Sequence, residues 1–209
     1  LDGFYALDYL VTLQSVTGDD GLRAVSSWND SQARISKLLR KNSPALAQSF
    51  EHFSKLVYNT SFAHDRVWEP SPFGLIDLDD ARLTSLLPEN CKDAAKPKII
   101  QAVIRLYEGY SGTTPGHIVY KYDPTLLAKL EKKSPLQVSF LYVHEWLWDV
   151  SPNVERNRRV NRFLHSKDVE TLTPAEFEAE LKGMGLQIPA LQPDVFEDSS
   201  CQGYPITEG

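Results

Sequence analysis

The stretch from Ser134 to Ser166 constrains the fold of this chain more than any other, because it predicts two helices joined by a corner. Ser134–Pro135 is typical of a helix start, where a serine caps free backbone N–H groups and a proline sacrifices no hydrogen bond. Ser151–Pro152 repeats this pattern and predicts the start of the second helix. A helix that is apolar nearly all round is expected to be buried, and the first helix fits this description. Its main apolar stripe consists of Leu136, Phe140, Val143 and Leu147.

His144 and Glu145 are the polar residues that this buried helix has to accommodate. Burying an unpaired charge is costly, so both side chains need polar partners or a place on the floor of a cleft. The second helix offers a stripe of polar residues at every fourth position, made of Asn153, Asn157, Asn161 and His165.

A purely structural interpretation explains these residues without catalysis, because a satisfied buried polar network fixes the angle between two helices. We weigh this interpretation beside every catalytic one, since ion-pair networks also perturb pKa values where no chemistry occurs. The candidate pairs are Glu145 with Arg158 or Arg162, and His144 with Asn157 or Asn161.

The His–Glu pair also invites comparison with the zinc-protease motif H-E-x-x-H, in which two histidines bind the metal and the glutamate acts as general base. Here the residue four positions after His144 is Trp148, which cannot bind zinc. We therefore predict no regular zinc site and no resident cofactor. Zinc would need other ligands, and the candidates are His165, His117, His64 and Glu155.

Acid–base chemistry without a metal is a further interpretation of the same helix. A carboxyl group that is buried and unpaired is harder to ionise, which suits a general acid or base. Glu145 could act with a second carboxylate, either Glu155 or Asp149, as in glycoside hydrolysis. The catalytic candidates are Glu145, His144 and Glu155, and the candidate binding residues are Asn157, Arg158, Asn161 and His165.

The rest of the chain predicts an α+β fold that is mainly helical, with a small antiparallel β-hairpin. We expect one globular domain over residues 1–186 and an extended C-terminal tail over 187–209, because the tail has little periodicity. Residues 59–90 are interpreted as an ordered loop. Helices are expected over Phe4–Gln14, Trp28–Lys41, Pro44–Tyr58, Pro124–Lys132 and from Thr173–Pro174 to about Gly183, and strands over Lys98–Tyr107 and His117–Tyr122.

Composition narrows the possible partners. The chain of 209 residues has a formal net charge of −6, which disfavours binding to nucleic acid or to an anionic membrane. No apolar run reaches transmembrane length. The chain begins at Leu1 instead of methionine, so we expect a segment upstream of it. Two well-separated cysteines, Cys91 and Cys201, indicate either one disulfide in an exported protein or two inert buried thiols in a cytosolic one. We predict the disulfide, because it would anchor the C-terminal tail.

The order of motifs from Cys91 to Ser166 resembles a family of exported bacterial proteins found in predatory and related bacteria. Its members show a cysteine, an Ile-rich strand, a second strand, a short helix, then an HE helix followed by an Asn/Arg helix. The resemblance implies export and a scaffold like a degenerate zincin, and it implies no particular activity. The residues that carry it are His144, Glu145, Asn157, Arg158, Asn161, Leu164 and Ser166, with Leu7–Asp8 and the sequence IDLDD before Cys91.

The function expected from these observations is that of a periplasmic or secreted hydrolase. It would act on a peptide or on a cell-envelope component such as peptidoglycan, with Glu145 as acid or base and His144 as its partner. One alternative is a non-catalytic protein that binds the envelope or a prey surface, in which the same residues are structural. A further alternative is a lysozyme-like glycosidase that uses paired carboxylates.

Overall fold

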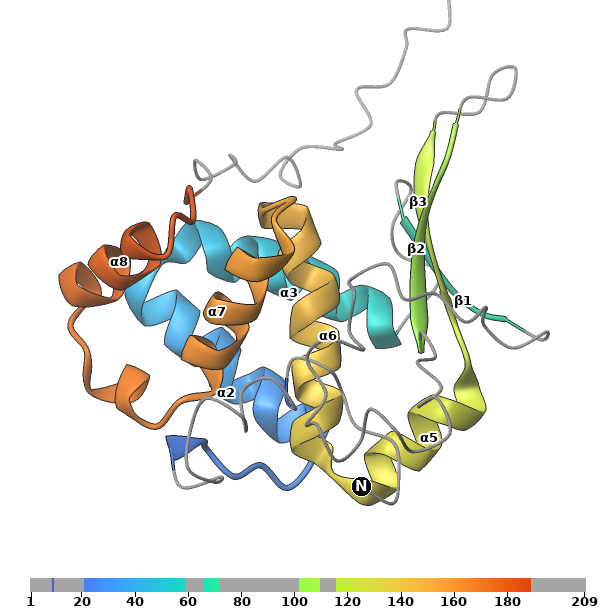
Figure 1. Ribbon diagram of the computed structural model, residues 1–209, viewed down its shortest axis with the longest axis horizontal. Helices are drawn as coiled ribbons and strands as arrows, with labels where there is room; N and C mark the ends of the chain where they lie inside the picture. The colour runs from blue at the N-terminus through green and yellow to red at the C-terminus, as the bar shows by residue number, and fades with distance from the viewer. Residues whose placement is uncertain (1–8, 10–20, 59–65, 72–101, 110–115, 189–209) are drawn as a thin grey trace, which may run out of the picture.

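The computed structural model describes residues 9, 21–58, 66–71, 102–109 and 116–188. Within these ranges the chain is α+β and mostly helical, with six α-helices and one three-stranded sheet, which confirms the predicted fold class. Figure 1 shows the helices gathered into one body and the sheet standing beside it. Among the described residues, no helix combines the length and the apolar character needed to cross a bilayer.

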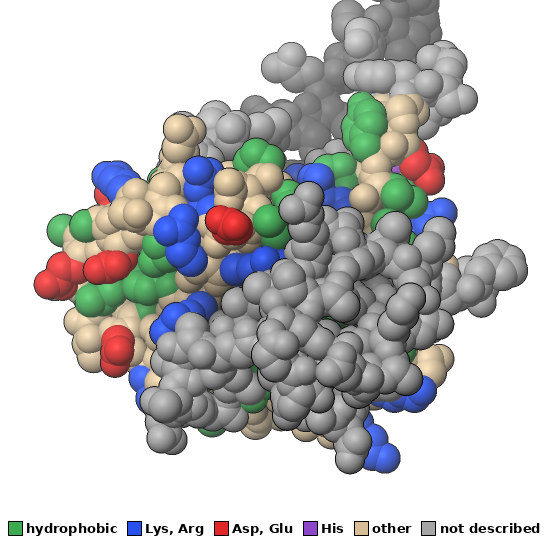
Figure 2. All heavy atoms as spheres, in the orientation of Figure 1, with side chains coloured by type: hydrophobic (Ala, Val, Ile, Leu, Met, Phe, Trp, Pro, Cys, Tyr) green, Lys and Arg blue, Asp and Glu red, His purple; other side chains and the backbone are tan. Residues whose placement is uncertain are grey.

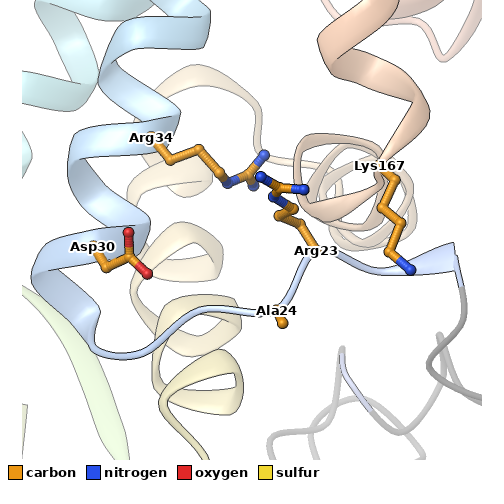
Figure 3. Close-up of a pocket in the computed structure, with 5 residues that line it drawn as sticks. All are labelled: Arg23, Ala24, Asp30, Arg34 and Lys167. Atoms are coloured by element: carbon orange, nitrogen blue, oxygen red, sulfur yellow. The ribbon is translucent and has the colours of Figure 1, made fainter.

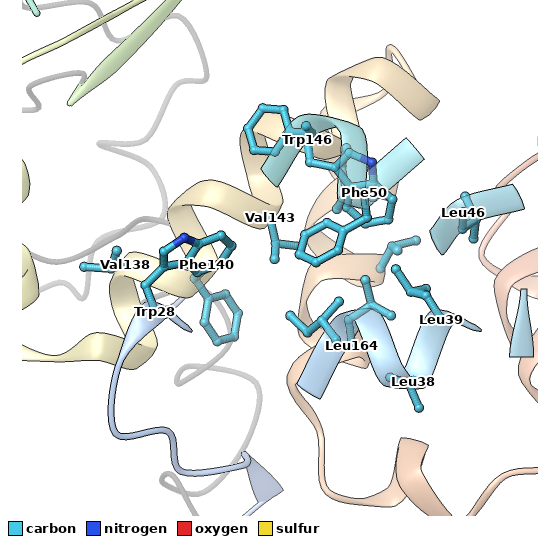
Figure 4. Packing of buried hydrophobic residues seen from close by; sticks show 14 of the residues in the cluster. Trp28, Leu38, Leu39, Leu46, Phe50, Val138, Phe140, Val143, Trp146 and Leu164 are labelled. Atoms are coloured by element: carbon cyan, nitrogen blue, oxygen red, sulfur yellow. The ribbon is translucent and has the colours of Figure 1, made fainter. Parts of the chain in front are cut away.

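Helices α2 (Trp28–Asn42) and α3 (Pro44–Tyr58) begin the described body, and both match their predicted ranges. The Ser27 side chain caps α2 by accepting a hydrogen bond from Asp30 N, which satisfies one of the free donors of the first turn. The two helices bury apolar stripes at helical spacing, including Ile35 and Leu39 on α2 and Leu46, Phe50 and Phe53 on α3. Figure 4 shows members of both stripes packed in the core with Val143, Trp146 and Leu164.

Helix α6 (Pro135–Val150) confirms the first predicted helix and its burial, because Phe140, Val143 and Leu147 are fully enclosed. Ser134 occupies the N-cap position as predicted, but its side chain makes no capping hydrogen bond. Helix α5 (Pro124–Lys133) precedes it and is capped by the Asp123 carboxylate, which accepts from two backbone N–H groups.

Helix α7 (Val154–His165) starts later than predicted, since its N-cap is Asn153 and not Ser151. The physical reason is that Ser151 closes the preceding helix, where its N–H donates to Leu147 O at 2.9 Å. The Ser151 carbonyl accepts from the buried Asn157 side chain at 2.9 Å, which fixes the corner between α6 and α7. The second helix is therefore confirmed, and its predicted cap is wrong.

The sheet consists of β1 (Arg66–Pro70), β2 (Val103–Glu108) and β3 (His117–Tyr122) in the order β1-β3-β2. The predicted hairpin is confirmed, because β2 and β3 pair antiparallel with Leu106 opposite Val119. The sheet is mixed, however, since β1 runs parallel to β3. The interpretation of residues 59–90 as a loop missed β1, a five-residue strand with charged residues and a terminal proline that weaken its apolar signal.

Aromatic side chains attach the sheet to the helical body. Trp68 on β1 and Tyr120 on β3 both pack edge-on against Phe53 of α3, with ring centroids 6.4 and 5.7 Å apart. Trp68 also stacks on Tyr122 at 5.3 Å. These contacts bury large apolar areas, so they set the position of the sheet against α3.

The chain after α7 continues through a short 3-10 helix η3 (Asp168–Thr171) to α8 (Pro174–Gly183). The predicted capping box of Thr173 and Glu176 is confirmed, with each residue bonded to the other's backbone N–H. Gly185 follows α8 and has a φ of 84°, in the left-handed region of backbone conformation. A residue with a side chain would be strained at this position. Several predicted features lie outside the described residues. They are the helix over 4–14 apart from Tyr9, both cysteines of the predicted disulfide, and residues 189–209 of the tail.

Candidate functional site

Glu145 and His144 occupy the positions on α6 that the sequence predicted, and their environments differ. The Glu145 side chain is buried, with 6% of the residue exposed, whereas His144 is half-buried. His144 Nε2 accepts a hydrogen bond from the indole N–H of Trp148 at 3.1 Å. Trp148 stands where a zinc protease has its second histidine, and its indole N–H occupies one of the two imidazole nitrogens of His144.

The other candidate zinc ligands are dispersed. His117 lies on β3 beside Glu108, with 3.6 Å between Nε2 and Oε2, while His165 is enclosed in the core. His64 lies outside the described residues. Within the described part of the chain, no group of three or more His, Cys, Asp or Glu side chains is placed to hold a metal ion.

Three residues of the polar stripe, Asn157, Asn161 and His165, are fully buried, whereas Asn153 is exposed at the N-cap of α7. The hydrogen bonds of the buried residues include several to main-chain carbonyls. Asn157 donates to Ser151 O, and Asn161 Nδ2 donates to Phe140 O at 2.8 Å. His165 Nδ1 donates to Asn161 O at 2.8 Å. These bonds tie α7 to α6 and to the corner between them, which is the architectural role of the structural interpretation.

His165 also ends a chain of hydroxyl groups that sequence reasoning missed. Because Nδ1 donates to a carbonyl, Nε2 accepts from Ser139 at 2.7 Å, and Ser139 in turn accepts from Ser31 at 2.5 Å. The serine–histidine contact has the geometry of an activated nucleophile. All three residues have no exposed surface, and the imidazole stacks on Phe140 at 4.0 Å, so no substrate reaches them. The chain joins α2, α6 and α7.

Glu155 and Arg158 take surface positions on α7. Glu155 is exposed in the first turn, where a carboxylate is stabilised by the positive end of the helix dipole. Arg158 is half-buried, and Glu145 lies buried on the other helix of the pair. The two carboxylates of the predicted acid–base pair therefore lie in different environments, Glu155 in solvent and Glu145 in the protein.

Asp149, the other candidate second carboxylate, belongs to a charged cluster between α6 and the sheet. Its carboxylate forms ion pairs with Arg66 of β1 and with Arg105 of β2, the latter at 3.3 Å. The Tyr120 hydroxyl of β3 donates to Asp149 Oδ1, also at 3.3 Å. Burial and the nearby Asp149 charge raise the pKa of Tyr120 to about 12, so the hydroxyl keeps its proton. One carboxylate thus bonds to all three strands.

A cavity of about 280 Å³ opens on another part of the surface, and we call it the cationic pocket. Its lining residues are Arg23, Ala24, Asp30, Arg34 and Lys167 (Figure 3). An isolated β-bridge between Leu22 and Ser166 brings these segments together, and Arg23 N donates to His165 O at 2.8 Å. Sequence reasoning missed the pocket because its cations are far apart along the chain and share no motif.

The charges of the cationic pocket are held in fixed positions. Arg34 Nη2 donates to Leu164 O at 2.6 Å, while Nη1 donates to Glu170 at 3.2 Å. Asp30 accepts two hydrogen bonds from Ser26, and the bond from the Ser26 backbone N–H is the main reason that the pKa of Asp30 is lowered. The carboxylate of Asp30 is therefore directed to its own helix terminus and stays ionised.

Comparisons of this chain with protein-family models, with curated proteins and with solved structures find no match. The resemblance to exported bacterial proteins with an HE helix therefore stays a prediction.

Proposed function

We propose that this chain is a non-catalytic binding protein that works in the periplasm or outside the cell and recognises an anionic component of the cell envelope, such as peptidoglycan. The observation that carries the proposal is the contrast between the buried polar residues of α7 and its arginines. Asn157, Asn161 and His165 are enclosed and hold the helices together, so they are not exposed to a substrate.

The opposite face of α7 supplies the binding chemistry. Figure 2 shows Lys and Arg side chains gathered around this helix on one face of the molecule. Arg159 is exposed, while the other arginines of α7, Arg156, Arg158 and Arg162, are half-buried. Nε of Arg156 and Nε and Nη2 of Arg158 are enclosed, so these two guanidinium groups are only partly accessible. The chain as a whole carries a net charge of −6, so a local concentration of guanidinium groups favours a particular anionic surface over general attraction to anions.

Co-sedimentation with purified peptidoglycan sacculi tests this proposal. We expect the wild-type protein to sediment with the sacculi and to release no soluble fragments from them. Arg159→Glu should weaken sedimentation, because Arg159 is exposed and its guanidinium makes one long hydrogen bond, to Met184 O at 3.4 Å. Lys132→Glu on α5 is the matched control, since it makes the same change of charge on another helix. Sedimentation that is equal for both variants would contradict the proposal.

A second candidate is the hydrolase predicted from the sequence, and the observation that favours it is the burial of Glu145 on the helix that also carries His144. A general acid or base benefits from such an environment. Release of soluble fragments from sacculi by the wild type, lost in Glu145→Gln, would favour this candidate over the non-catalytic one.

A further inference from the structure

Two guanidinium groups of the cationic pocket share one carboxylate oxygen. Glu170 Oε1 lies 3.6 Å from Arg23 Nε and 3.2 Å from Arg34 Nη1. Figure 3 shows the two guanidinium groups next to each other at the centre of the pocket, with Lys167 on the far side of Arg23. The nearby charge of Arg23 is among the causes that lower the pKa of Arg34, after burial itself. The two arginines therefore repel each other, and an anion between them relieves the repulsion.

Glu170 is the carboxylate that contacts both arginines, and it contributes a single negative charge to the pair. Asp30 also lines the pocket and its charge acts on Arg34, but its carboxylate accepts its two hydrogen bonds from Ser26. Arg34 Nε, which is buried, makes no hydrogen bond within the described ranges of the chain. Arg34 itself is held by Leu164 O, so its guanidinium stays in place whether or not Glu170 contacts it.

We propose that the cationic pocket binds a phosphoryl group and that the Glu170 carboxylate occupies this position until the ligand displaces it. The inference rests on the proposed role of the chain as a binding protein for anionic envelope components, and it adds a phosphoryl group as a ligand beside peptidoglycan. Glu170 is free to move aside because it belongs to the short helix η3 and its side chain is 36% exposed.

A phosphoryl group fits the pocket better than a carboxylate does. A phosphate monoester carries nearly two negative charges at neutral pH and offers three acceptor oxygens, whereas a carboxylate carries one charge on two oxygens. Arginine pairs recognise such groups through parallel N–H donors. The cavity of about 280 Å³ is at the lower end of ligand-pocket volumes, which start at about 300 Å³, so it suits one head group and not a large ligand.

The competing interpretation treats Glu170 as a clamp only. It would join the segment around Arg23 to α2 and η3, and the pocket would have no ligand. Exposed ion pairs of this kind contribute little to stability, so a clamp and a displaceable competitor predict similar melting temperatures. Ligand affinity separates them, because removing a competitor tightens binding and removing a clamp does not.

The test is an NMR titration of the ¹⁵N-labelled protein at about pH 7.5, where phosphate esters are mostly dianionic. The probes are inorganic phosphate, glycerol 3-phosphate as an ester, and glucuronate as a carboxylate, each at constant ionic strength. We expect both phosphates to shift the amide signals of Ala24 and Lys167 and to bind several times more tightly than glucuronate.

Glu170→Gln should bind phosphate about threefold to fivefold more tightly, since it removes a competing charge of the kind found in exposed ion pairs. Glu178→Gln on α8 is the matched control, because it removes the same charge from an exposed ion pair outside the pocket and should leave affinity unchanged. Arg23→Gln should weaken binding. Equal or weaker binding by Glu170→Gln, or glucuronate binding as tight as phosphate, would overturn the inference. So would the absence of phosphate binding while the protein still sediments with sacculi, and that result would leave the proposed function intact.

Discussion

Two polar clusters lie on opposite halves of α6, and they differ in how their polar groups are buried. The first is the hydroxyl chain of Ser31, Ser139 and His165, which is fully enclosed and has uncharged serine links. The second joins Asp149 to Arg66, Arg105 and Tyr120, and its arginines keep 18% and 34% of their side-chain surface exposed. Charges are tolerated where water still reaches part of the cluster, while the enclosed site uses neutral hydroxyls.

The two clusters also hold different parts of the molecule in place. The hydroxyl chain lies within the helical body and joins three helices, where apolar packing already determines most of the arrangement. The charged cluster lies between α6 and the sheet, and Asp149 bonds to every strand. The sheet should therefore depend on its polar contacts more than the helices do.

Glu145 lies on α6 between the two clusters, and its replacement should have the largest effect. Glu145→Gln keeps the shape of the side chain but removes its charge, in a residue that is only 6% exposed. If Glu145 is structural, the substitution therefore disrupts its buried interactions. Disrupting a buried charged pair costs about 3–5 kcal/mol. For a chain of this size that lowers the melting temperature by roughly 6–20 °C.

A thermal melt of wild type and Glu145→Gln at neutral pH checks this expectation. An unchanged or higher melting temperature would count against the structural role, because active-site residues are often held at a cost in stability. That outcome would favour the hydrolase candidate.

Asp149→Asn should have the next largest effect. The substitution leaves Arg66 and Arg105 without their shared carboxylate, which we expect to cost about 3 kcal/mol and to lower the melting temperature by roughly 6–12 °C. The loss should shrink as salt is added, because the arginines are partly exposed and their interactions are screened. Chemical denaturation at low and high salt measures it. Glu155→Gln, which changes an exposed carboxylate, is the control, and an equal loss in both variants would refute a special role for Asp149.

Ser139→Ala should have a smaller effect that does not depend on salt. The substitution removes the hydroxyl that joins Ser31 to His165 and leaves both without this hydrogen bond inside the core. The expected loss is about 1–3 kcal/mol, since unsatisfied buried polar groups cost this much. The double variant with Ser31→Ala should lose less than the sum of the two single losses, because the residues form one network. Additive losses, or a loss that shrinks in salt as in Asp149→Asn, would contradict the contrast between the clusters.

Local patterns made most helices predictable, because caps and apolar spacing are properties of neighbouring residues. The capping box of α8 and the stripe of α7 are examples. The start of α7 was misplaced since serine and asparagine are both good caps. Ser151 is not the cap because its N–H closes α6 on Leu147 O and its carbonyl accepts from the Asn157 side chain.

Features that depend on distant residues were not predictable from such patterns. Strand β1 pairs with β3 from far along the chain, with Trp68 opposite Tyr120. The hydroxyl chain joins Ser31 to Ser139, which are 108 positions apart. The cationic pocket likewise needs the fold to bring its residues together, whereas the burial of Glu145 followed from the apolar character of its helix.

Tyr120→Phe should have the smallest effect at neutral pH, and its pH dependence tests the charged cluster directly. The substitution removes the hydroxyl that donates to Asp149 and should cost about 1 kcal/mol. In the wild type, burial and the Asp149 charge raise the pKa of Tyr120 from 10.0 to about 12, so the folded state holds this proton more firmly than the unfolded state does. The resulting stability is fully present below pH 10 and is lost as the pH rises towards 12. A pKa raised from 10.0 to about 12 corresponds to about 2.7 kcal/mol, which exceeds the advantage of about 1 kcal/mol that wild type has at neutral pH. The free energies of unfolding of wild type and Tyr120→Phe should therefore converge and then cross in this window, which denaturation curves at a series of alkaline pH values measure. Tyr107→Phe is the control, because Tyr107 is 68% exposed and should show no such convergence. Parallel curves for wild type and Tyr120→Phe would show that the Asp149 cluster does not hold the hydroxyl proton.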